Sequence, residues 1–251
     1  MSKYEVVMTM GERNWGVYGK NALESFDEYW PKDVHAYVYF DGNLPDVKYD
    51  RIHFIPYHDV IHEQESFKQR NQHRHPHTAN LEVNDITYQA VKFSYKVYAQ
   101  LYELEQARAD YIIYLDADVM TKAPVTHELL ETISNENAYV SFLNRPGKYT
   151  ETGFIIWNTN HPYHKEWCEQ YRSMYDEDKI FEYDAWHDCI AFDACTLPKI
   201  QEGVIQGIDL SYGTGSKHPL VTGPLGAYFD HLKGPSRKAT GFSPERKRAG
   251  F

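Results

Sequence analysis

The sequence predicts a single α/β domain in which a mainly parallel central sheet is flanked by helices. Short apolar runs rich in β-branched and aromatic residues, which are typical of buried strands, alternate with stretches whose apolar residues recur at helical spacing. This alternation favours parallel strands joined by right-handed helical crossovers. At 251 residues the chain is long enough for one sizeable core, and no linker, internal repeat or low-complexity tract divides it.

The N-terminal part of the chain predicts three strands and one helix. Strands are expected over 3–10, 35–40 and 51–56, and the helix over 17–30, which Pro31 closes. The polar loop between the first strand and this helix lies at the edge where open α/β sheets bind ligands. Three of its side chains could contact a nucleotide base or phosphate: Thr9, Arg13 and Asn14. A simple solvated turn is an equally good interpretation of this loop.

Two segments of different character precede the next strand. Residues 58–82 are polar and predict a surface loop. Its alternating histidines, which lack any further ligand signature for a transition metal, are His73, His75 and His77. A helix is then expected from Asn84 as N-cap to about Ala107. The apolar stripe of this helix consists of Ile86, Ala90, Phe93, Val97, Leu101 and Leu104.

The same helix carries two lysines on a separate face. Lys92 and Lys96 lie one turn apart, and the helix leads into a strand that ends in carboxylates. The pair could contact the phosphates of a donor substrate, or it could form a solvated basic face.

Two carboxylates follow the most apolar strand of the chain. The run 111–115 is continuous and apolar, and it ends in Asp116 and Asp118. On an extended chain, residues two apart point to the same side, roughly 6.5–7 Å between their Cα atoms. Two carboxylates this close favour a hard divalent cation, because Mg²⁺ and Mn²⁺ take protein carboxylates together with substrate phosphates. An isolated Asp-x-Asp is often only a solvated turn, so the assignment of a metal site depends on further motifs in the chain.

Three later segments have the character of active-site loops. Residues 152–158 form a predicted strand that begins with Gly153, where backbone could approach a ligand closely, and ends at Asn158. Asp188 stands at the start of a helical stretch. His231 could complete the coordination of a metal held by carboxylates. The groups that follow it and could approach or neutralise a phosphate are Gly234, Arg237 and Lys238.

This ordered set resembles the metal-dependent glycosyltransferases of the Rossmann-like GT-A fold. It is most similar to the retaining family that includes glycogenin and the bacterial lipopolysaccharide galactosyltransferases. The matching motifs, which span most of the chain in the family's order, are Asp116-Ala117-Asp118, the strand from Gly153 to Asn158, Asp188, and His231-x-x-Gly234-x-x-Arg237. Two positions depart from the family. Arg237-Lys238-Ala239 replaces Lys-Pro-Trp, and Cys189 replaces a Gln.

The resemblance implies a role for each matching residue. Asp116, Asp118 and His231 would bind Mn²⁺ or Mg²⁺, and Asp116 would also reach the ribose of a nucleotide-sugar donor. Gly234 with Arg237 or Lys238 would contact its diphosphate. Asp188 would lie near the sugar and the reaction centre, as a catalytic residue together with the two aspartates of the motif.

The resemblance also implies the reaction and the organisation of the chain. A sugar would pass, with retention, from a nucleoside diphosphate sugar, most simply a UDP-sugar, to the hydroxyl of an acceptor. Residues 1–120 would form the nucleotide-sugar-binding half of one domain. Residues 121–251 would form the acceptor-side half and carry the C-terminal metal and diphosphate loop. A saccharide is the favoured acceptor, ahead of a protein or a modified nucleobase.

Composition narrows the remaining possibilities. A net charge of −10 argues against broad nucleic-acid binding, although the segment 233–248 is locally basic. Three cysteines without a CxxC pattern fit reduced thiols in the cytoplasm. We see no signal-peptide pattern at the N-terminus and no apolar run near the ~20 residues that span a bilayer.

Three alternatives remain open at the level of sequence. A sugar-nucleotide nucleotidyltransferase should carry a richer glycine and basic loop after its first strand than Gly11-Glu12-Arg13-Asn14. A non-catalytic nucleotide- or sugar-binding module would not need Asp116, Asp118 and His231 together. A viral-type glycosyltransferase acting on modified DNA would bind DNA with a steep salt dependence.

Overall fold

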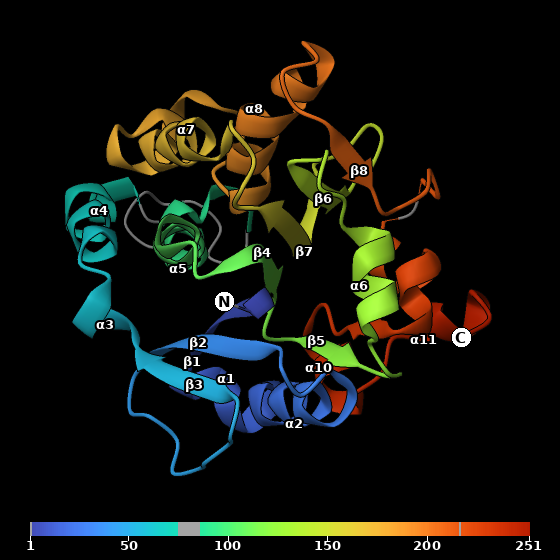
Figure 1. The fold of residues 1–251 in the computed structure, drawn as a ribbon. Coiled ribbons are helices and arrows are strands. Elements are labelled where there is room, and N and C mark those ends of the chain that lie inside the picture. Colours follow the sequence, from blue (N-terminus) through green and yellow to red (C-terminus); the bar gives the residue numbers. More distant parts are fainter. Residues whose placement is uncertain (1, 75–85, 216) are drawn as a thin grey trace.

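The computed structural model describes residues 2–74, 86–215 and 217–251. It confirms the predicted class, an α/β fold built on one seven-stranded sheet with the strand order β3-β2-β1-β4-β7-β6-β8 (Figure 1). The strands of this sheet are β1 (Ser2–Gly11), β2 (His35–Asp41), β3 (Ile52–Pro56), β4 (Ala109–Leu115), β6 (Val140–Leu143), β7 (Glu151–Asn158) and β8 (Gly207–Asp209). A second, two-stranded sheet pairs β5 (Val119–Thr121) with β9 (Phe229–His231).

The central sheet is mainly parallel, as predicted. β1, β2, β3 and β4 run parallel to one another, and β6 runs parallel to β8. β7 is the exception, because it is antiparallel to both β4 and β6. The carboxyl ends of β1, β2 and β4 therefore meet the amino end of β7 at one edge of the sheet.

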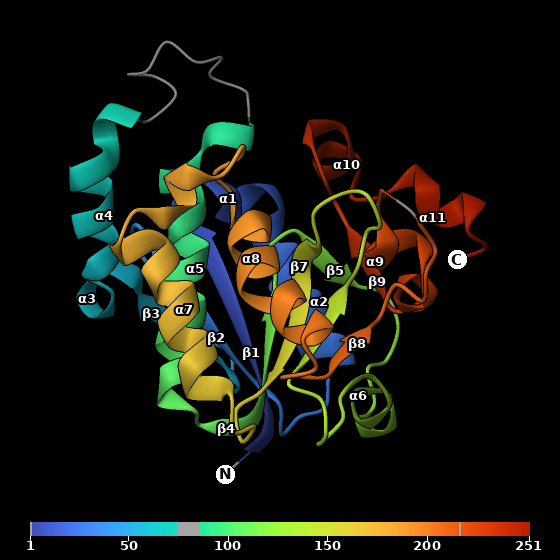
Figure 2. The ribbon, with the colours of Figure 1, turned by 90° about the horizontal axis from the view of Figure 1, so that it is seen from above.

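Helices cover both faces of the sheet (Figures 1 and 2). Alternate residues of each strand supply the two cores, as in β4, where Ile112 and Tyr114 join one cluster and Ile113 and Leu115 join the other. The first cluster packs under α5, α7 and α8, and the second packs against α2. The α-helices are α1 (Glu12–Asn14), α2 (Lys20–Tyr29), α3 (Tyr57–Val60), α4 (Glu63–Asn71), α5 (Ala90–Gln106), α6 (His127–Ile133), α7 (His164–Asp176), α8 (Asp188–Gln201), α9 (Pro219–Thr222), α10 (Pro235–Thr240) and α11 (Pro244–Arg248).

Most of the predicted elements are confirmed. The predicted strands over 3–10, 35–40, 51–56 and 152–158 coincide with β1, β2, β3 and β7 within two residues. The helix expected at Asp188 begins at that residue as α8.

Two predicted loops are wrong, because the chain there is helical. The loop after β1 forms α1 and a π-helical turn, Trp15–Gly19, where the Trp15 ring packs against Phe40 and Phe54. The predicted surface loop 58–82 begins with α3 and α4, followed by a 3₁₀ turn at Gln72–Arg74. Tertiary contacts hold α4 in place, since Phe67 is fully buried.

The long helix begins later than predicted. α5 starts at Ala90, after a 3₁₀ turn at Ile86–Tyr88. Ile86, expected in the buried stripe, is exposed because it precedes the helix. The predicted N-cap Asn84 and the histidines His75 and His77 lie outside the described residues. Among the described helices, none is both long enough and apolar enough to cross a membrane.

Candidate active site

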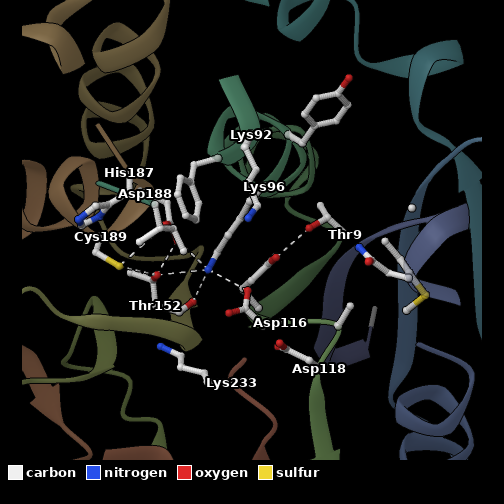
Figure 3. A pocket seen from close by; sticks show the side chains of 18 of the residues that line it. Thr9, Lys92, Lys96, Asp116, Asp118, Thr152, His187, Asp188, Cys189 and Lys233 are labelled. Atoms are coloured by element: carbon white, nitrogen blue, oxygen red, sulfur yellow. Dashed lines mark hydrogen bonds and ion pairs between the residues drawn. The ribbon is translucent and has the colours of Figure 1, made fainter. Parts of the chain in front are cut away.

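A cavity of about 780 Å³ opens at the edge where β1, β2 and β4 end (Figure 3). This volume suits a ligand of drug or nucleotide size. Its walls come from the ends of these strands, from α5, from the start of β7 and α8, and from the segment after β9.

The two aspartates after β4 occupy a tight turn at this cavity. The Asp116 carbonyl accepts the Val119 N–H at 2.9 Å, and the Asp116 N–H donates to the Gly153 carbonyl at 3.0 Å. The prediction that this segment remains extended is therefore wrong. The chain turns because Val119 begins β5, which leaves the central sheet to pair with β9.

His231 reaches the aspartates through this second sheet. It is the pairing partner of Val119, and its ring is almost fully buried. The His231 Nε2 lies 3.1 Å from Asp118 Oδ1 and 3.6 Å from Asp116 Oδ2. The structure thus brings the three predicted metal ligands together.

Gly153 makes room for that histidine. A Cβ at this position would lie 2.6 Å from His231 Cε1 and 3.0 Å from Asp116 Oδ2. The glycine is needed for side-chain packing, whereas we expected it to admit a ligand. Asn158, at the far end of β7, is buried and donates to the Glu136 carbonyl at 3.0 Å, so it is not a cavity group.

Lys96 forms the inner part of the site. Its ammonium lies 2.9 Å from Asp116 Oδ1 and 2.7 Å from Asp188 Oδ2, and it donates to the Thr152 carbonyl at 2.8 Å (Figure 3). Asp188 also accepts the Thr152 hydroxyl at 2.5 Å. The interpretation of Lys96 as a solvated face is wrong, because the side chain is buried. Lys92, one turn earlier, is exposed and lines the cavity.

Asp188 and Lys96 stabilise each other's charged forms. Burial opposes the charge of Asp188, but the adjacent Lys96 ammonium outweighs it and holds the pKa of that carboxyl below its ordinary value. Burial likewise opposes the charge of Lys96, and Asp116 and Asp188 outweigh it and raise its pKa. Asp188 is therefore a carboxylate that contacts both the Lys96 ammonium and the Thr152 hydroxyl.

Lys238 forms the outer part of the site. Gly234 has a φ of +83°, which favours glycine, and after it α10 directs the Lys238 ammonium to 2.8 Å from Asp118 Oδ2. Burial opposes the charge of Asp118, but His231 and Lys238 outweigh it and hold the pKa of that carboxyl well below its usual range. The neighbouring Arg237 forms an ion pair with Glu245 of α11 instead.

Of the residues predicted to contact a nucleotide in the loop after β1, some line the cavity and one does not. Thr9 and Asn14 line the cavity, and Thr9 shares a 2.9 Å hydrogen bond with the Tyr114 hydroxyl. Arg13 is exposed on α1 and, in the described chain, is absent from the cavity lining, as is Arg237.

Glu151 is the main site residue that the sequence analysis missed. Its carboxylate is buried at the start of β7, forms an ion pair with Lys233 and lies 3.5 Å from Arg145. Burial opposes its charge, but Lys233 and His231 outweigh it and lower the pKa of Glu151 to about 2. An acidic residue directly before the predicted strand 152–158 was the available signal.

The residues present fit a divalent cation. One donor atom from each of Asp116, Glu151 and His231 lies within 4.8 Å of the others, and Asp118 adds an oxygen next to His231 Nε2. Carboxylate oxygens with one imidazole suit Mn²⁺ or Mg²⁺. A second cluster, His187, Asp188 and Cys189, fits poorly. Burial raises the pKa of the Cys189 thiol to about 12, so it stays protonated, and Asp188 is held by Lys96.

Comparison with known proteins gives two kinds of match. Residues 86–198, somewhat less than half of the chain, match the family model described as Glycosyl transferase family 2. This stretch includes Asp116, Asp118 and Asp188. No curated protein sequence matches the chain.

Several solved structures share the fold. Galactosyltransferase LgtC, in complex with donor and acceptor sugar analogues, is 16% identical, with 98% of this chain and 95% of LgtC covered and a TM-score of 0.57. Mouse xyloside xylosyltransferase 1 is 11% identical, with 87% and 91% covered and a TM-score of 0.50. Glycosyltransferase GlyE of Streptococcus pneumoniae is 12% identical, with a TM-score of 0.47, and the 84% of this chain that matches spans only 46% of GlyE.

The fold is therefore GT-A, as the sequence analysis predicted. The chain is therefore similar to LgtC in fold, and residues 86–198 are similar to the Glycosyl transferase family 2 model.

Proposed function

We propose that this enzyme transfers a sugar from a nucleoside diphosphate sugar, most simply a UDP-sugar, to an acceptor hydroxyl, with retention and with Mn²⁺ or Mg²⁺ bound. The observation that carries the proposal is the convergence of Asp116, Asp118 and His231 at the cavity, although they come from different strands and turns. The donor and acceptor analogues in the LgtC complex support a similar pair of substrates here.

A divalent cation held by Asp116, Asp118 and His231 would neutralise the charge that develops on the leaving diphosphate. Lys238 and the backbone at Gly234 line the same part of the cavity and would bind the diphosphate. Lys92 faces the cavity from α5 and would add a further positive charge.

Asp188 would orient the donor sugar. Its carboxylate is already engaged by Lys96 and the Thr152 hydroxyl, so it is poorly placed to leave them and attack the anomeric carbon. Retention then requires the acceptor to enter on the face from which the diphosphate departs, and no strong general base is needed. We keep the assignment of residues 1–120 to the nucleotide end and 121–251 to the acceptor end as part of this proposal.

An aromatic wall at the other end of the cavity supports a saccharide acceptor. Phe93, Tyr149 and His187 line it, and Tyr149 is 40% exposed with its ring 5.0 Å from His187, edge to face. Aromatic faces provide large apolar area at little cost in entropy, which suits a sugar ring. Tyr149→Ala should raise the KM for a saccharide acceptor without changing the hydrolysis of the donor alone. Tyr183→Ala is the matched control, because Tyr183 is 41% exposed but does not line the described cavity.

Titration calorimetry tests the proposed function directly. UDP is titrated into the protein with Mn²⁺ and then with EDTA, and UDP-sugars are screened for slow hydrolysis. We expect binding only with metal and UDP release from one donor. Metal-independent binding without hydrolysis would instead favour a non-catalytic binding module. Failure of UDP, GDP and other nucleotides to bind would overturn the proposal.

A further inference from the structure

A second hollow adjoins the cavity. It has a volume of about 650 Å³, which is the size of a ligand site, and the described residues that line it are Arg145, Gly147, Lys148, Tyr149 and Asp193. Arg145 and Tyr149 also line the cavity, so the two spaces share a wall. The reaction proposed above does not use the hollow.

Two neighbouring loops form this end of the site. Residues 144–150 follow β6 and residues 210–215 follow β8, and these two strands are parallel neighbours in the sheet (Figure 1). β4 and β6 are both antiparallel to β7, so β4, β6 and β8 end at the same edge. Binding residues are often carried by loops that a rigid sheet positions in this way.

Arg145 holds the first loop in shape. Its guanidinium donates to the carbonyls of Tyr149, at 2.5 Å, and Thr150, at 3.1 Å. It also donates to the Lys217 carbonyl at 3.4 Å, which ties the loop to the segment after β8. From α8, Asp193 Oδ2 accepts the Thr150 N–H at 3.1 Å. A loop fixed by these contacts is ordered in advance, so a ligand binds it at little cost in conformational entropy.

Two side chains of this loop are left available to a ligand. Lys148 is exposed, and its ammonium takes part in no ion pair among residues 2–74, 86–215 and 217–251. Tyr149 is 40% exposed. An ammonium supplies three hydrogen-bond donors, and an aromatic ring supplies a flat apolar face. A sugar, which has apolar faces and hydroxyl groups at its edges, fits both.

Tyr212, in the second loop, is exposed although its backbone is strained. Its φ of +50° is a left-handed conformation that residues other than glycine rarely adopt, and 60% of its surface is exposed. The turn is fixed by Asp209, whose Oδ1 accepts the N–H groups of Ser211, at 2.8 Å, and Asn144, at 3.2 Å. A strained backbone that presents an exposed aromatic ring beside a binding site supports a ligand contact at that ring.

Beyond His187, the wall of the cavity is closed. The Trp186 N–H donates to the Thr87 carbonyl at 2.6 Å, and the Tyr88 ring packs edge to face on the Trp186 ring, with centroids 5.1 Å apart. These contacts join residues 86–88 to the segment that leads to His187. A ligand that extends out of the cavity therefore has its path over the loops that follow β6 and β8.

We propose that the acceptor is a saccharide chain of three sugars or more, which leaves the cavity through the hollow. The reacting sugar would lie in the cavity, the second sugar against Tyr149 and Lys148, and the third against Tyr212. The identity of the chain as an acceptor rests on the proposed function, whereas its binding does not require catalysis.

Glycan arrays test the inference by binding alone. Labelled protein is applied, with and without Mn²⁺ and UDP, to arrays of mono-, di- and trisaccharides of matched sequence. We expect trisaccharides to bind at least roughly tenfold more tightly than the corresponding monosaccharides, because each aromatic contact adds a few-fold in affinity.

Two variants should lower this preference to about threefold or less. Tyr212→Asn removes the ring, and asparagine tolerates the left-handed backbone. Lys148→Met removes the ammonium at an exposed position. Tyr212→Phe keeps the ring and should keep the preference. Tyr183→Asn is the matched control, because Tyr183 is 41% exposed but lines neither the described cavity nor the hollow.

Each outcome decides the inference. Equal binding of mono- and trisaccharides, or no binding of any saccharide, overturns it, as does a preference that survives in both Tyr212→Asn and Lys148→Met. Loss of the preference in Tyr183→Asn instead would place the chain on the other side and would also overturn it. Metal-dependent UDP binding without a length preference would leave the proposed function standing. A length preference that depends on Tyr212, in a protein that binds no nucleotide, would defeat the proposed function and leave the saccharide site standing.

Discussion

Lys96 and Lys238 neutralise the two carboxylates of the same turn in different ways. Lys96 projects from the 17-residue helix α5, is 9% exposed, and contacts two carboxylates and Thr152. Lys238 projects from the six-residue helix α10, is 25% exposed, and contacts Asp118 and the face of Tyr18. Their distances to the aspartates are nearly equal, at 2.9 and 2.8 Å. From this difference in burial we expect the fold to require Lys96, whereas under the proposed function Lys238 would exchange Asp118 for a phosphate of the donor.

The largest expected effect comes from removing the inner cation. Lys96→Met leaves Asp116 and Asp188 without their buried partner, and breaking such a pair costs about 3–5 kcal/mol. We expect a loss of this size in the free energy of unfolding, measured with urea. Lys92→Met, one turn earlier and exposed, should change it by about 0.5 kcal/mol at most. A loss below about 1 kcal/mol for Lys96→Met would show that burial does not distinguish the two cations.

The second effect concerns the outer carboxylate. Asp118→Asn should keep the fold, because the side chain lies at the cavity wall, and should reduce turnover at saturating Mn²⁺ by at least roughly 100-fold. Turnover is measured as UDP release from the best donor. Asp110→Asn, at the other end of β4, removes a carboxylate that is hydrogen-bonded to Asn160 and serves as the control. Near-normal turnover in Asp118→Asn would contradict the metal site.

A third effect decides between the two C-terminal cations predicted to bind phosphate. Lys238→Met should weaken UDP binding about tenfold, because a charge-assisted contact to a phosphate is lost. Arg237→Met should change it less than about twofold, since its partner is Glu245. Calorimetry with Mn²⁺ present compares the two variants. The reverse order would mean that α10 rearranges when the donor binds.

The smallest effect is a surface ion pair with a defined pH dependence. Arg237 lowers the pKa of Glu245 to about 2, from an ordinary value of 4.5. Because the folded-state pKa is depressed, the stabilisation is present above pH 4.5 and is lost as the pH falls toward 2. Glu245→Gln should cost at most about 1 kcal/mol near neutral pH. That difference should shrink in urea titrations at lower pH, whereas Glu182→Gln, at an exposed acid elsewhere, should show no such trend.

The local sequence pattern was sufficient to predict the strands of the central sheet and the main groups of the site. Asp116, Asp118 and Asp188 follow or begin regular elements, so their place at one edge could be predicted from strand and helix boundaries. His231 was a candidate ligand by its chemistry, but its sequence neighbourhood does not show that β9 pairs with β5, so the resemblance to a family was needed to place it with the two aspartates.

Tertiary pairing explains what the sequence did not predict. Lys96 looked like a surface residue by its helical position, yet it is buried because two carboxylates from distant segments meet it. Glu151 looked like an ordinary strand residue until Lys233 and His231 folded onto it. Arg13 and Lys238 were both predicted to contact a phosphate. Of the two, only Lys238 lines the cavity, because α1 and α10 point their side chains in different directions.

The pairing of β5 with β9 also has a consequence for the order of folding. The two strands lie roughly 110 residues apart in sequence, and contacts of such long range slow folding because loop closure must come first. Asp116 follows a central strand, whereas His231 arrives only when β9 has docked. We expect the complete ligand set to form late in folding. Metal binding would then mark the end of folding, and a nascent chain that lacks β9 would not bind the metal.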